Sequence, residues 1–308
     1  MLRSFLLYLS ENERLERSIL KFGWAKRTAR RFVAGETAEE ALQVIRKLND
    51  RGFLATLDHL GENVNSEVEA RTAAEEYLKL LPKIAELGLQ SHVSLKLTQM
   101  GLDIGMDLCR ENVERIIAKA EELKNSVRID IEGSEYTTRT FDLFAELRGK
   151  YKNVGAALQA NLRRSEQDLK NLIELGANVR LTKGAYKEPP QIAYQKKREV
   201  DANYIKLMGM LLSPEARAKG AYAAIATHDE RMIAQAKELA ARNDISKEEF
   251  EFQMLLGIRG RLAERLANEG YRMRIYVSYG TEWYPYYMRR LAERPANLLF
   301  ILKNILKR

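Results

Sequence analysis

The chain has 308 residues, of which 45% are hydrophobic and 31% charged, and its net charge is +8. This hydrophobic fraction is ample for a large core, and no apolar run approaches the roughly 20 residues that a membrane-spanning helix needs. The basic residues form no long block and Cys109 is the only cysteine, so we expect neither a nucleic-acid partner nor a disulfide framework.

Residues 1–50 carry helical patterns. Leu15, Ile19 and Phe22 recur at helical spacing, and a second set does the same. The second set is Ala41, Leu42, Ile45 and Leu48. We therefore predict an N-terminal helical arm over 1–50, followed by one catalytic domain over 51–308.

From Phe53 onward, short β-prone runs alternate with helical stretches. The eight runs are Phe53–Leu57, His92–Leu97, Val127–Ile131, Val154–Ala160, Asn178–Thr182, Tyr222–Thr227, Phe250–Leu255 and Arg272–Val277. This alternation is typical of βα units and a parallel sheet. No G-x-G-x-x-G follows a strand, which argues against an open dinucleotide-binding sheet. We predict an α/β fold, a closed (β/α)8 TIM barrel.

Polar residues occupy one face of these runs near their carboxyl ends. In Arg128–Glu132, for example, the isoleucines alternate with Asp130 and Glu132. The predicted inward set is Lys96, Asp130, Glu132, Gln159, Arg180, Gln253 and Tyr276. Buried charge is costly unless it is paired, and a TIM barrel has its active site at this end. The set as a whole predicts a binding site, although for any one member a structural ion pair is the simpler interpretation.

The segment Tyr276–Asn297 reads as a strand, a glycine turn and a helix with adjacent arginines. Five tyrosines and Trp283 precede Arg289 and Arg290, and Glu293 follows Arg289 by one helical turn. Paired guanidinium groups bind a carboxylate through parallel hydrogen bonds, and aromatic rings suit an apolar body. The segment predicts a clamp for a small anion such as an amino acid. The alternative is a solvated basic flank of the helix.

Several motifs together resemble the signature of monofunctional bacterial proline dehydrogenases. They are Val93–Thr98, Arg128–Ser134, Ala157–Asn161, Arg180–Pro189, Ala226–Asp229, Phe250–Leu255 and Tyr276–Asn297. The resemblance runs in order from about Phe53 to Asn297. One departure is Ser278, because that family leads us to expect proline at this position. We expect the absence of proline to loosen the turn after the strand.

The resemblance implies a distorted barrel with a C-terminal helix over its mouth and non-covalently bound FAD. The implied reaction is oxidation of L-proline to Δ1-pyrroline-5-carboxylate, with electrons passed to a membrane quinone. The bifunctional relatives carry a further aldehyde dehydrogenase domain, for which 308 residues leave no space. A separate pyrroline-5-carboxylate dehydrogenase is therefore expected as a partner enzyme.

The resemblance also assigns the substrate site. Arg289, Arg290 and Lys96 match the family's carboxylate clamp, while Tyr276 and Leu255 match its apolar wall. These residues would hold the proline ring against the flavin.

Charged neighbours complete the implied catalytic set. Asp130 is expected to pair with Lys96, Glu293 with an arginine of its helix, and Arg180 to lie near the flavin N5. No histidine is an obvious base, so deprotonation of the substrate amine to solvent is our hypothesis.

Cofactor binding is assigned to residues at the ends of three strands and on the last helix. They are Gln159, Arg180, Lys183, Gly184, Ala185, Tyr186, Thr227, His228 and Glu293. Gln159 is expected to contact the isoalloxazine, and Thr227 and His228 the pyrophosphate or adenosine end. Without the resemblance, His228 is a core histidine and Gly184 a simple turn glycine.

Several features leave more than one interpretation open. Cys109 lies in a helical pattern and is expected in the core, and no metal-ligand spacing occurs. Leu298–Arg308 and Phe5–Leu9 are candidates for peripheral contact with a membrane, and Phe5–Leu9 also for self-association into a homo-oligomer. We expect a cytoplasmic protein, with any membrane contact at the inner face of the cell membrane.

Two other functions compete with proline oxidation. One is another flavin-dependent barrel oxidoreductase, such as a methylenetetrahydrofolate reductase-like enzyme. The arginine pair favours an amino-acid carboxylate over a large pterin. The other is a non-catalytic basic scaffold, which leaves the polar barrel interior unexplained.

Overall fold

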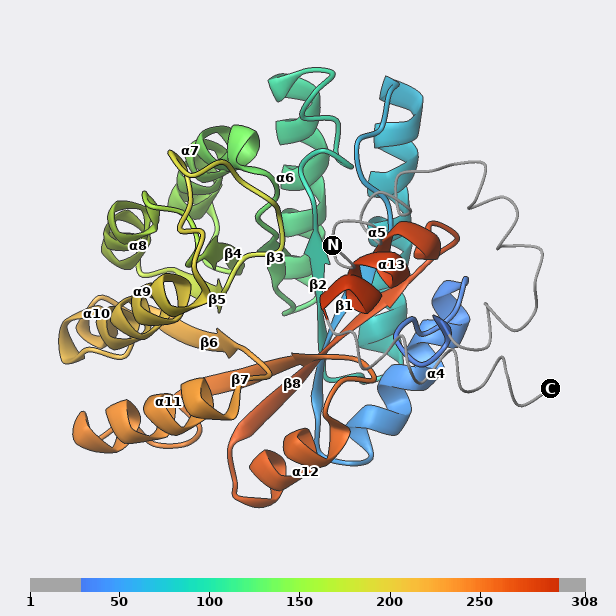
Figure 1. Cartoon of the computed structure of the whole chain (residues 1–308). Coiled ribbons are helices and arrows are strands. Elements are labelled where there is room, and N and C mark those ends of the chain that lie inside the picture. The colour runs from blue at the N-terminus through green and yellow to red at the C-terminus, as the bar shows by residue number, and fades with distance from the viewer. Residues whose placement is uncertain (1–28, 294–308) are drawn as a thin grey trace.

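The computed structural model describes residues 29–293, and for 289–293 it describes the backbone alone. Its centre is a closed barrel of eight parallel strands in which each strand pairs with the next along the chain (Figure 1). The last strand closes the barrel by pairing with the first, with Leu54 opposite Arg274 and His59 opposite Tyr279. The predicted (β/α)8 TIM barrel is confirmed.

All eight predicted strands are present. They are β1 (Leu54–His59), β2 (Ser91–Leu95), β3 (Val127–Ile129), β4 (Val154–Gln159), β5 (Asn178–Thr182), β6 (Tyr222–Ala226), β7 (Phe250–Leu255) and β8 (Arg272–Tyr279). Strands β5 and β7 have the predicted bounds, and the other six differ at one or both ends.

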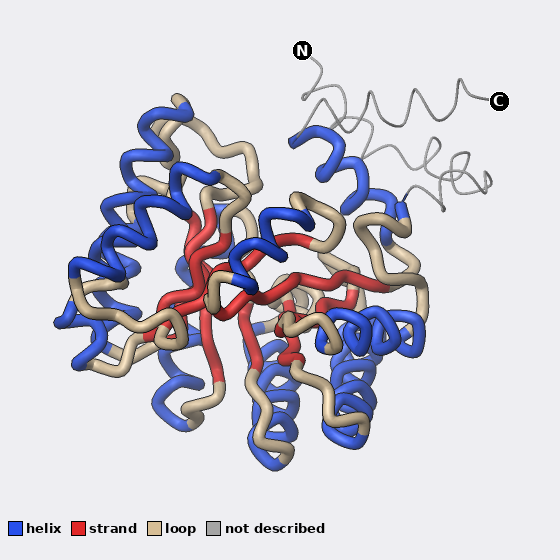
Figure 2. Tube along the Cα trace, turned by 90° about the horizontal axis from the view of Figure 1, so that it is seen from below, coloured by secondary structure: helices blue, strands red, loops and turns tan. Residues whose placement is uncertain are grey.

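Helices surround the barrel, as the view from below shows (Figure 2). They are α4 (Ala38–Asn49), α5 (Glu67–Glu86), α6 (Met106–Glu122), α7 (Ser134–Lys150), α8 (Ser165–Glu174), α9 (Lys197–Leu211), α10 (Pro214–Ala218), α11 (Glu230–Arg242), α12 (Gly260–Asn268) and α13 (Trp283–Glu293). Side-chain caps fix several of their starts. Thr37 and Ser66 each accept a backbone N–H at 3.2 Å, at α4 and α5.

The main hydrophobic core lies between the helices and the outer face of the barrel. In β1, for example, Ala55 and Leu57 are fully buried in this core. Cys109 of α6 belongs to it, as predicted, and burial raises the pKa of its thiol to about 12. Alternate strand residues point the other way, so the barrel interior receives the polar side chains.

The amino ends of the strands carry a polar layer inside the barrel. Arg274 donates to both oxygens of Glu251, at 2.8 and 3.0 Å, and to the carbonyl of Ala55 at 2.6 Å. Arg128 donates to the carbonyls of Ala156 and Asn178 at 3.0 and 2.7 Å. Both arginines are at most 9% exposed. Burying a charged group is costly unless it is hydrogen-bonded, and these acceptors offset that cost.

Helix α4 covers β1 and β8 of the barrel. Its buried residues are Ala41, Leu42, Ile45 and Leu48, which confirms the predicted apolar face. The pattern Leu15, Ile19 and Phe22 lies outside the described residues. The domain boundary near residue 50 stays a prediction.

Ser278 lies inside β8 rather than at a turn. The strand continues to Tyr279, so the prediction that it ends at Val277 was wrong. The preceding N-terminal segment supports this extension: Val33 forms a bridge with Ser278, and the N–H of Ala34 donates to the Ser278 carbonyl at 2.8 Å. Ser278 is fully buried, held by strand pairing on both sides.

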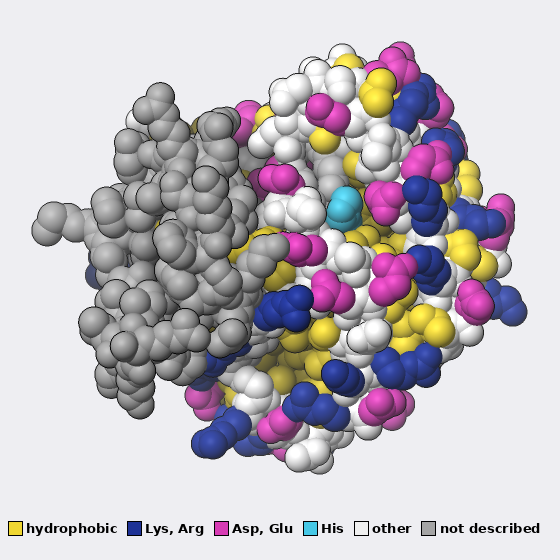
Figure 3. Space-filling model, turned by 90° about the vertical axis from the view of Figure 1, so that its right-hand side faces the viewer, with side chains coloured by type: hydrophobic (Ala, Val, Ile, Leu, Met, Phe, Trp, Pro, Cys, Tyr) yellow, Lys and Arg dark blue, Asp and Glu magenta, His cyan; other side chains and the backbone are white. Residues whose placement is uncertain are grey.

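The surface mixes charges of both signs. Figure 3 shows basic and acidic side chains interspersed over one face. Many form exposed ion pairs, such as Arg71 with Glu111 at 2.7 Å. Over 29–293, none of the helices combines the length and apolar character needed to cross a membrane.

Candidate active site

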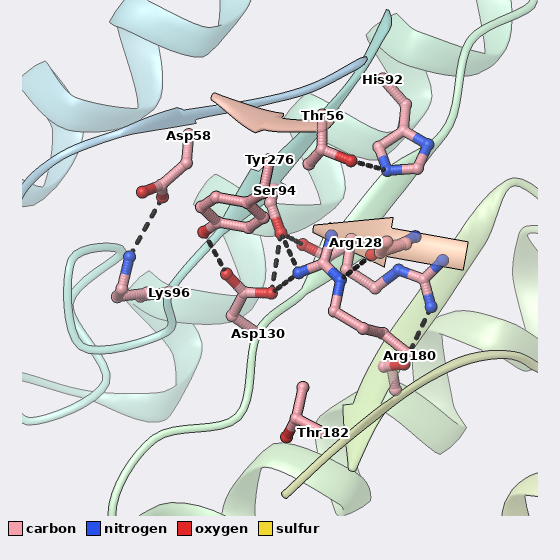
Figure 4. A network of polar contacts seen from close by, with 12 residues as sticks. Thr56, Asp58, His92, Ser94, Lys96, Arg128, Asp130, Arg180, Thr182 and Tyr276 are labelled. Carbon is pink, nitrogen blue, oxygen red and sulfur yellow. Dashed lines mark hydrogen bonds and ion pairs between the residues drawn. The ribbon is translucent and has the colours of Figure 1, made fainter. Parts of the chain in front are cut away.

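The carboxyl ends of the strands gather a second polar layer inside the barrel (Figure 4). The side chains come from β1, the ends of β2 and β3, and β5, β7 and β8. They are Asp58, Ser94, Lys96, Asp130, Arg180, Gln253 and Tyr276. Five of the seven residues are at most 8% exposed as whole residues, and Asp130 and Tyr276 are half-buried. The predicted polar interior is therefore present.

Asp130 is the centre of this layer. Its Oδ1 accepts from Ser94 Oγ at 2.8 Å and pairs with Arg180 Nη1, and its Oδ2 accepts from Tyr276 Oη at 2.6 Å. Burial and the carboxylates of Asp130 and Asp58 raise the pKa of Tyr276 well above its usual value. The phenol thus stays protonated and can donate.

Lys96 pairs with Asp58 rather than with Asp130. Its Nζ lies 3.0 Å from Asp58 Oδ1, so the predicted Lys96–Asp130 pair was wrong. Burial disfavours the ammonium form, but the carboxylates of Asp58, Glu62 and Asp130 outweigh it and raise the pKa of Lys96 well above its usual value. Asp130 contributes to this field without being the direct partner.

Two of the three guanidinium nitrogens of Arg180 are hydrogen-bonded to side chains. Its Nε donates to Gln253 Oε1 at 2.7 Å, its Nη1 donates to Ser94 Oγ at 3.1 Å, and its guanidinium carbon lies 4.9 Å from the Tyr276 ring centroid. Nη2 is buried and has no hydrogen-bond partner among the described residues. An unpaired buried donor of this kind is costly unless an acceptor reaches it.

Gln159, at the end of β4, joins two loops. Its Nε2 donates to the carbonyl of Glu132 at 2.8 Å, and its Oε1 accepts the N–H of Ala185 at 3.3 Å. The neighbouring Gly184 has φ +108°, and a Cβ there would lie 2.0 Å from Asn161 Oδ1. Only glycine fits this close approach, so the glycine has a packing reason beyond a simple turn.

Lys183 lies between two carboxylates. Its Nζ pairs with Asp201 of α9 and, at 3.0 Å, with Asp229 at the start of α11. Burial opposes ionisation of Asp229, but hydrogen bonds from Lys183 and Arg231 lower its pKa below the usual range. The ammonium group therefore has a fixed place at the rim of the barrel, near Thr227.

Glu132 belongs to the same end of the barrel but has no cationic partner among the described residues. Its two oxygens accept the N–H and the hydroxyl of Thr98, at 3.1 and 2.6 Å. Burial raises the pKa of Glu132 to about 7. The carboxyl group thus changes its protonation state near neutral pH.

Helix α13 lies against the segment around Phe32. Trp283, Tyr284 and Tyr287 are buried in a second apolar cluster with Phe32, and half-buried Leu255 packs against it. Arg289, Arg290 and Glu293 are on the last turns of this helix, but their side chains lie outside the described residues. The terminal segments Phe5–Leu9 and Leu298–Arg308 lie outside them as well.

Sequence reasoning left two residues of this layer out of the predicted inward set, Ser94 and Asp58. The signal for Asp58 was present, because Thr56 and Asp58 alternate with Ala55 and Leu57 in the same way as the other inward residues. The predicted strand stopped at Leu57, two residues before β1 ends at His59. In the part of the chain that the structure describes, no group of three metal-ligating side chains occurs.

The site's chemistry fits a flavin. Arg180 Nη2 is a buried donor without a hydrogen-bond partner among the described residues. A flavin isoalloxazine presents carbonyl and ring-nitrogen acceptors, which are complementary to such a donor.

Comparisons with known proteins agree on one family. A family model described as proline dehydrogenase matches residues 41–303. The chain is 42% identical to proline dehydrogenase 1 of Bacillus subtilis (strain 168), covering 100% of both chains, and 39% identical to the proline dehydrogenase of Deinococcus radiodurans, covering 99% of this chain and 98% of that one.

One solved structure extends the agreement to three dimensions. Proline utilization A (PutA) from Bdellovibrio bacteriovorus, inactivated by N-propargylglycine, superimposes with a TM-score of 0.83 at 28% identity. The match covers 95% of this chain and 36% of that one, so this chain spans about a third of that protein's length.

Proposed function

This chain belongs to the proline dehydrogenase family and is an enzyme of that family, and we propose that it oxidises L-proline to Δ1-pyrroline-5-carboxylate with FAD as its cofactor. The observation that carries the proposal is the buried layer of Lys96, Asp130 and Arg180 at the mouth of the barrel. FAD, when bound, supplies the hydride acceptor. The family places the chain in proline catabolism, which favours proline over a folate as the substrate.

Lys96 is proposed to attract the substrate carboxylate. Its ammonium group is kept charged by Asp58 and lies at the carboxyl end of β2. Arg289 and Arg290 of α13 are proposed to complete the clamp. A carboxylate held by three cations is fixed in position and orientation.

Tyr276 and Leu255 are proposed to form the apolar wall for the pyrrolidine ring. They are paired residues on neighbouring strands β8 and β7. The Tyr276 hydroxyl is turned onto Asp130 Oδ2, so the phenol is held in one orientation by this bond. A rigid wall of this kind restricts the ring to one pose.

Asp130 is proposed to orient its neighbours rather than to abstract a proton. Both of its oxygens already accept hydrogen bonds, from Ser94, Arg180 and Tyr276. The substrate amine must lose a proton before the adjacent carbon can give up a hydride, and we propose that solvent takes this proton. A pH–rate profile of Asp130→Asn checks this: loss of an ionisation seen in the native profile would make the carboxylate the base.

The cofactor is proposed to lie along the ends of β4, β5 and β6. Arg180 would offset negative charge on the flavin through Nη2, and Gln159 and the 183–186 loop would border the ring. Glu293 would act from α13. Lys183, Thr227 and His228 would face the pyrophosphate or adenosine end. The unpaired Arg180 donor supports this placement.

The proposed partners follow from the reaction. Electrons are proposed to pass to a membrane quinone, with contact through one of the terminal segments. The product would be oxidised by a separate pyrroline-5-carboxylate dehydrogenase. Liposome flotation of chains truncated at either end tests the contact, and unchanged binding by both truncations would contradict it.

An absorbance spectrum tests the central proposal. The purified chain should be yellow, and L-proline added without oxygen should bleach the visible flavin band. An artificial dye should then restore it. D-proline and a reduced folate are the matched controls and should leave the band in place. A chain that stays colourless after gentle purification, or a band that proline does not bleach, would overturn the proposal.

A further inference from the structure

His228 makes a contact that no cofactor role requires. Its Nε2 accepts the backbone N–H of Leu255 at 3.0 Å. His228 lies two residues after β6, and Leu255 is the last residue of β7. The imidazole therefore joins the loop after one strand to the end of the next.

This contact continues the pairing of β6 with β7 by a side chain. The strands pair with Ala226 opposite Gln253, and the N–H of Thr227 donates to the Gln253 carbonyl at 3.2 Å. The next N–H of β7 that faces β6 is that of Leu255, and it donates to the imidazole of His228. A side-chain nitrogen thus takes the place that a main-chain carbonyl occupies in a regular ladder.

The acceptor role fixes the state of the imidazole. A ring nitrogen that accepts a hydrogen bond carries no proton, so His228 is neutral here, with its hydrogen on Nδ1. Leucine at this position could not accept the bond, whereas glutamine offers Oε1 at about the same reach as Nε2.

Leu255 is held on its other side by β8. It pairs in register with Tyr276, and the N–H of Leu256 donates to the Tyr276 carbonyl at 3.0 Å. The carbonyl of Leu255 accepts the N–H of Ile258 at 3.2 Å. The side chain then packs against the apolar cluster of α13. With His228, the Leu255 main chain is fixed from both neighbouring strands.

We propose that His228 is a positioning residue for the substrate wall, holding Leu255 in the place where it contacts the pyrrolidine ring. This inference rests on the proposed function, because it takes Leu255 as part of the proline site. It adds a role to the cofactor contact expected of His228, and it couples the cofactor side of the mouth to the substrate side.

Three variants test the proposal: His228→Leu, His228→Gln and Leu255→Ala. Steady-state dye reduction gives KM for L-proline and kcat, and absorbance gives the flavin content of each preparation. Removing a buried acceptor should raise KM about tenfold in His228→Leu, while kcat per bound flavin changes less than about threefold. His228→Gln should keep KM within about twofold of the native value, because its acceptor remains.

A double variant separates positioning from a general loss of structure. If His228 acts through Leu255, then His228→Leu should raise KM less than about twofold in a Leu255→Ala background, because coupled residues are not additive. Binding of cyclopentanecarboxylate, measured by calorimetry, gives a second reading. This analogue has the ring and the carboxylate but no amine to oxidise, and its Kd should follow the same pattern.

Four outcomes would overturn the proposal. One is loss of flavin from His228→Leu with an unchanged KM in the flavin-bound fraction, which would make His228 a cofactor residue only. The second is a glutamine variant as impaired as the leucine variant. The third is a tenfold rise in KM when His228→Leu is introduced into the Leu255→Ala background. The fourth combines three results: His228→Leu does not fold, His228→Gln has a native KM, and Leu255→Ala leaves KM unchanged. Failure of the proposed function itself looks different, because the unsubstituted chain would then show no proline-dependent dye reduction.

Discussion

The two ends of the barrel interior use the same residue types in different ways. At the amino ends, Arg128 directs two of its three hydrogen bonds to main-chain carbonyls, which the strands hold in place. Arg274 directs one of its three to a carbonyl and the other two to the Glu251 carboxylate. At the carboxyl ends, Lys96 and Arg180 donate to side chains. A carbonyl in a strand cannot turn away, whereas a carboxylate, amide or hydroxyl can re-form its bonds with a ligand. We therefore expect the amino-end layer to contribute to stability and the carboxyl-end layer to binding.

Gln253 connects the two layers. Its Oε1 accepts from Arg180 Nε at 2.7 Å, and its Nε2 donates to Glu251. Glu251 in turn holds Arg274. The difference between the ends is therefore one of partners within a single continuous network, and substitutions at each end should separate activity from stability.

The largest expected effect is on activity, at the carboxyl ends. Arg180→Met removes the buried donor and should lower kcat/KM about 1000-fold, as loss of a preorganised charge does in other active sites. Steady-state dye reduction with L-proline measures it. Arg128→Met is the matched control at the amino ends and should keep kcat/KM per folded, flavin-bound chain within about threefold. Equal losses of kcat/KM in the two variants would contradict the functional difference between the two ends of the barrel.

The largest expected effect on stability lies at the amino ends. Glu251→Gln leaves the Arg274 guanidinium without its counter-charge, so the free energy of unfolding should fall by about 3 kcal/mol, as for other broken buried pairs. Burial opposes ionisation of Glu251, but Arg274 and Gln253 lower its pKa, so the carboxylate is charged in the native chain. Urea denaturation at neutral pH measures the change. A loss below about 1 kcal/mol would mean that the layer does not depend on this pair.

Glu132 should give the carboxyl ends a pH-dependent stability. Its pKa is raised from 4.5 to about 7 by burial, so the folded state favours the protonated form. The resulting stability is present below about pH 4.5 and is lost as the pH rises to about 7, by at most ~3 kcal/mol. Glu132→Gln keeps the hydrogen-bonding group without the charge and should remove this loss.

Urea denaturation at about pH 5 and about pH 8 measures the Glu132 effect, because these values lie near the two ends of its titration. Thr98→Val is the control. It removes the hydroxyl that donates to the Glu132 carboxylate, which raises the pKa of Glu132 further, so the loss should extend to a higher pH and be larger. The same stability difference between Glu132→Gln and the native chain at both pH values would contradict the prediction.

The smallest expected effect concerns Lys96. Asp58→Asn keeps an acceptor for Nζ but removes the charge that holds the pKa of Lys96 up against burial. The ammonium form should then be lost at a lower pH, so KM for proline should be near native at about pH 7 and rise about tenfold by about pH 10. A pH series of KM measures it. A rise of equal size at every pH would assign Asp58 a purely steric role.

Much of the fold could be predicted because its signals are local. Alternation within Val127–Ile131 and the other runs marked both the strands and the inward face, and the order of motifs marked the family. Strand ends were less certain. The predicted end of β1 at Leu57 hid Asp58, and the extension of β8 through Ser278 depends on Val33, which lies far away in the sequence.

The sequence by itself determined which side chains enter the barrel, since a period of two fixes the face of every strand residue. Only the tertiary structure decided their partners. Lys96 and Asp130 directly follow the consecutive strands β2 and β3, yet Lys96 bonds to Asp58 from β1, and Asp130 bonds to Arg180 from β5 and Tyr276 from β8. These pairings depend on the stagger and closure of the barrel, which bring residues 38 to 146 positions apart within hydrogen-bond distance, and no local pattern records that geometry.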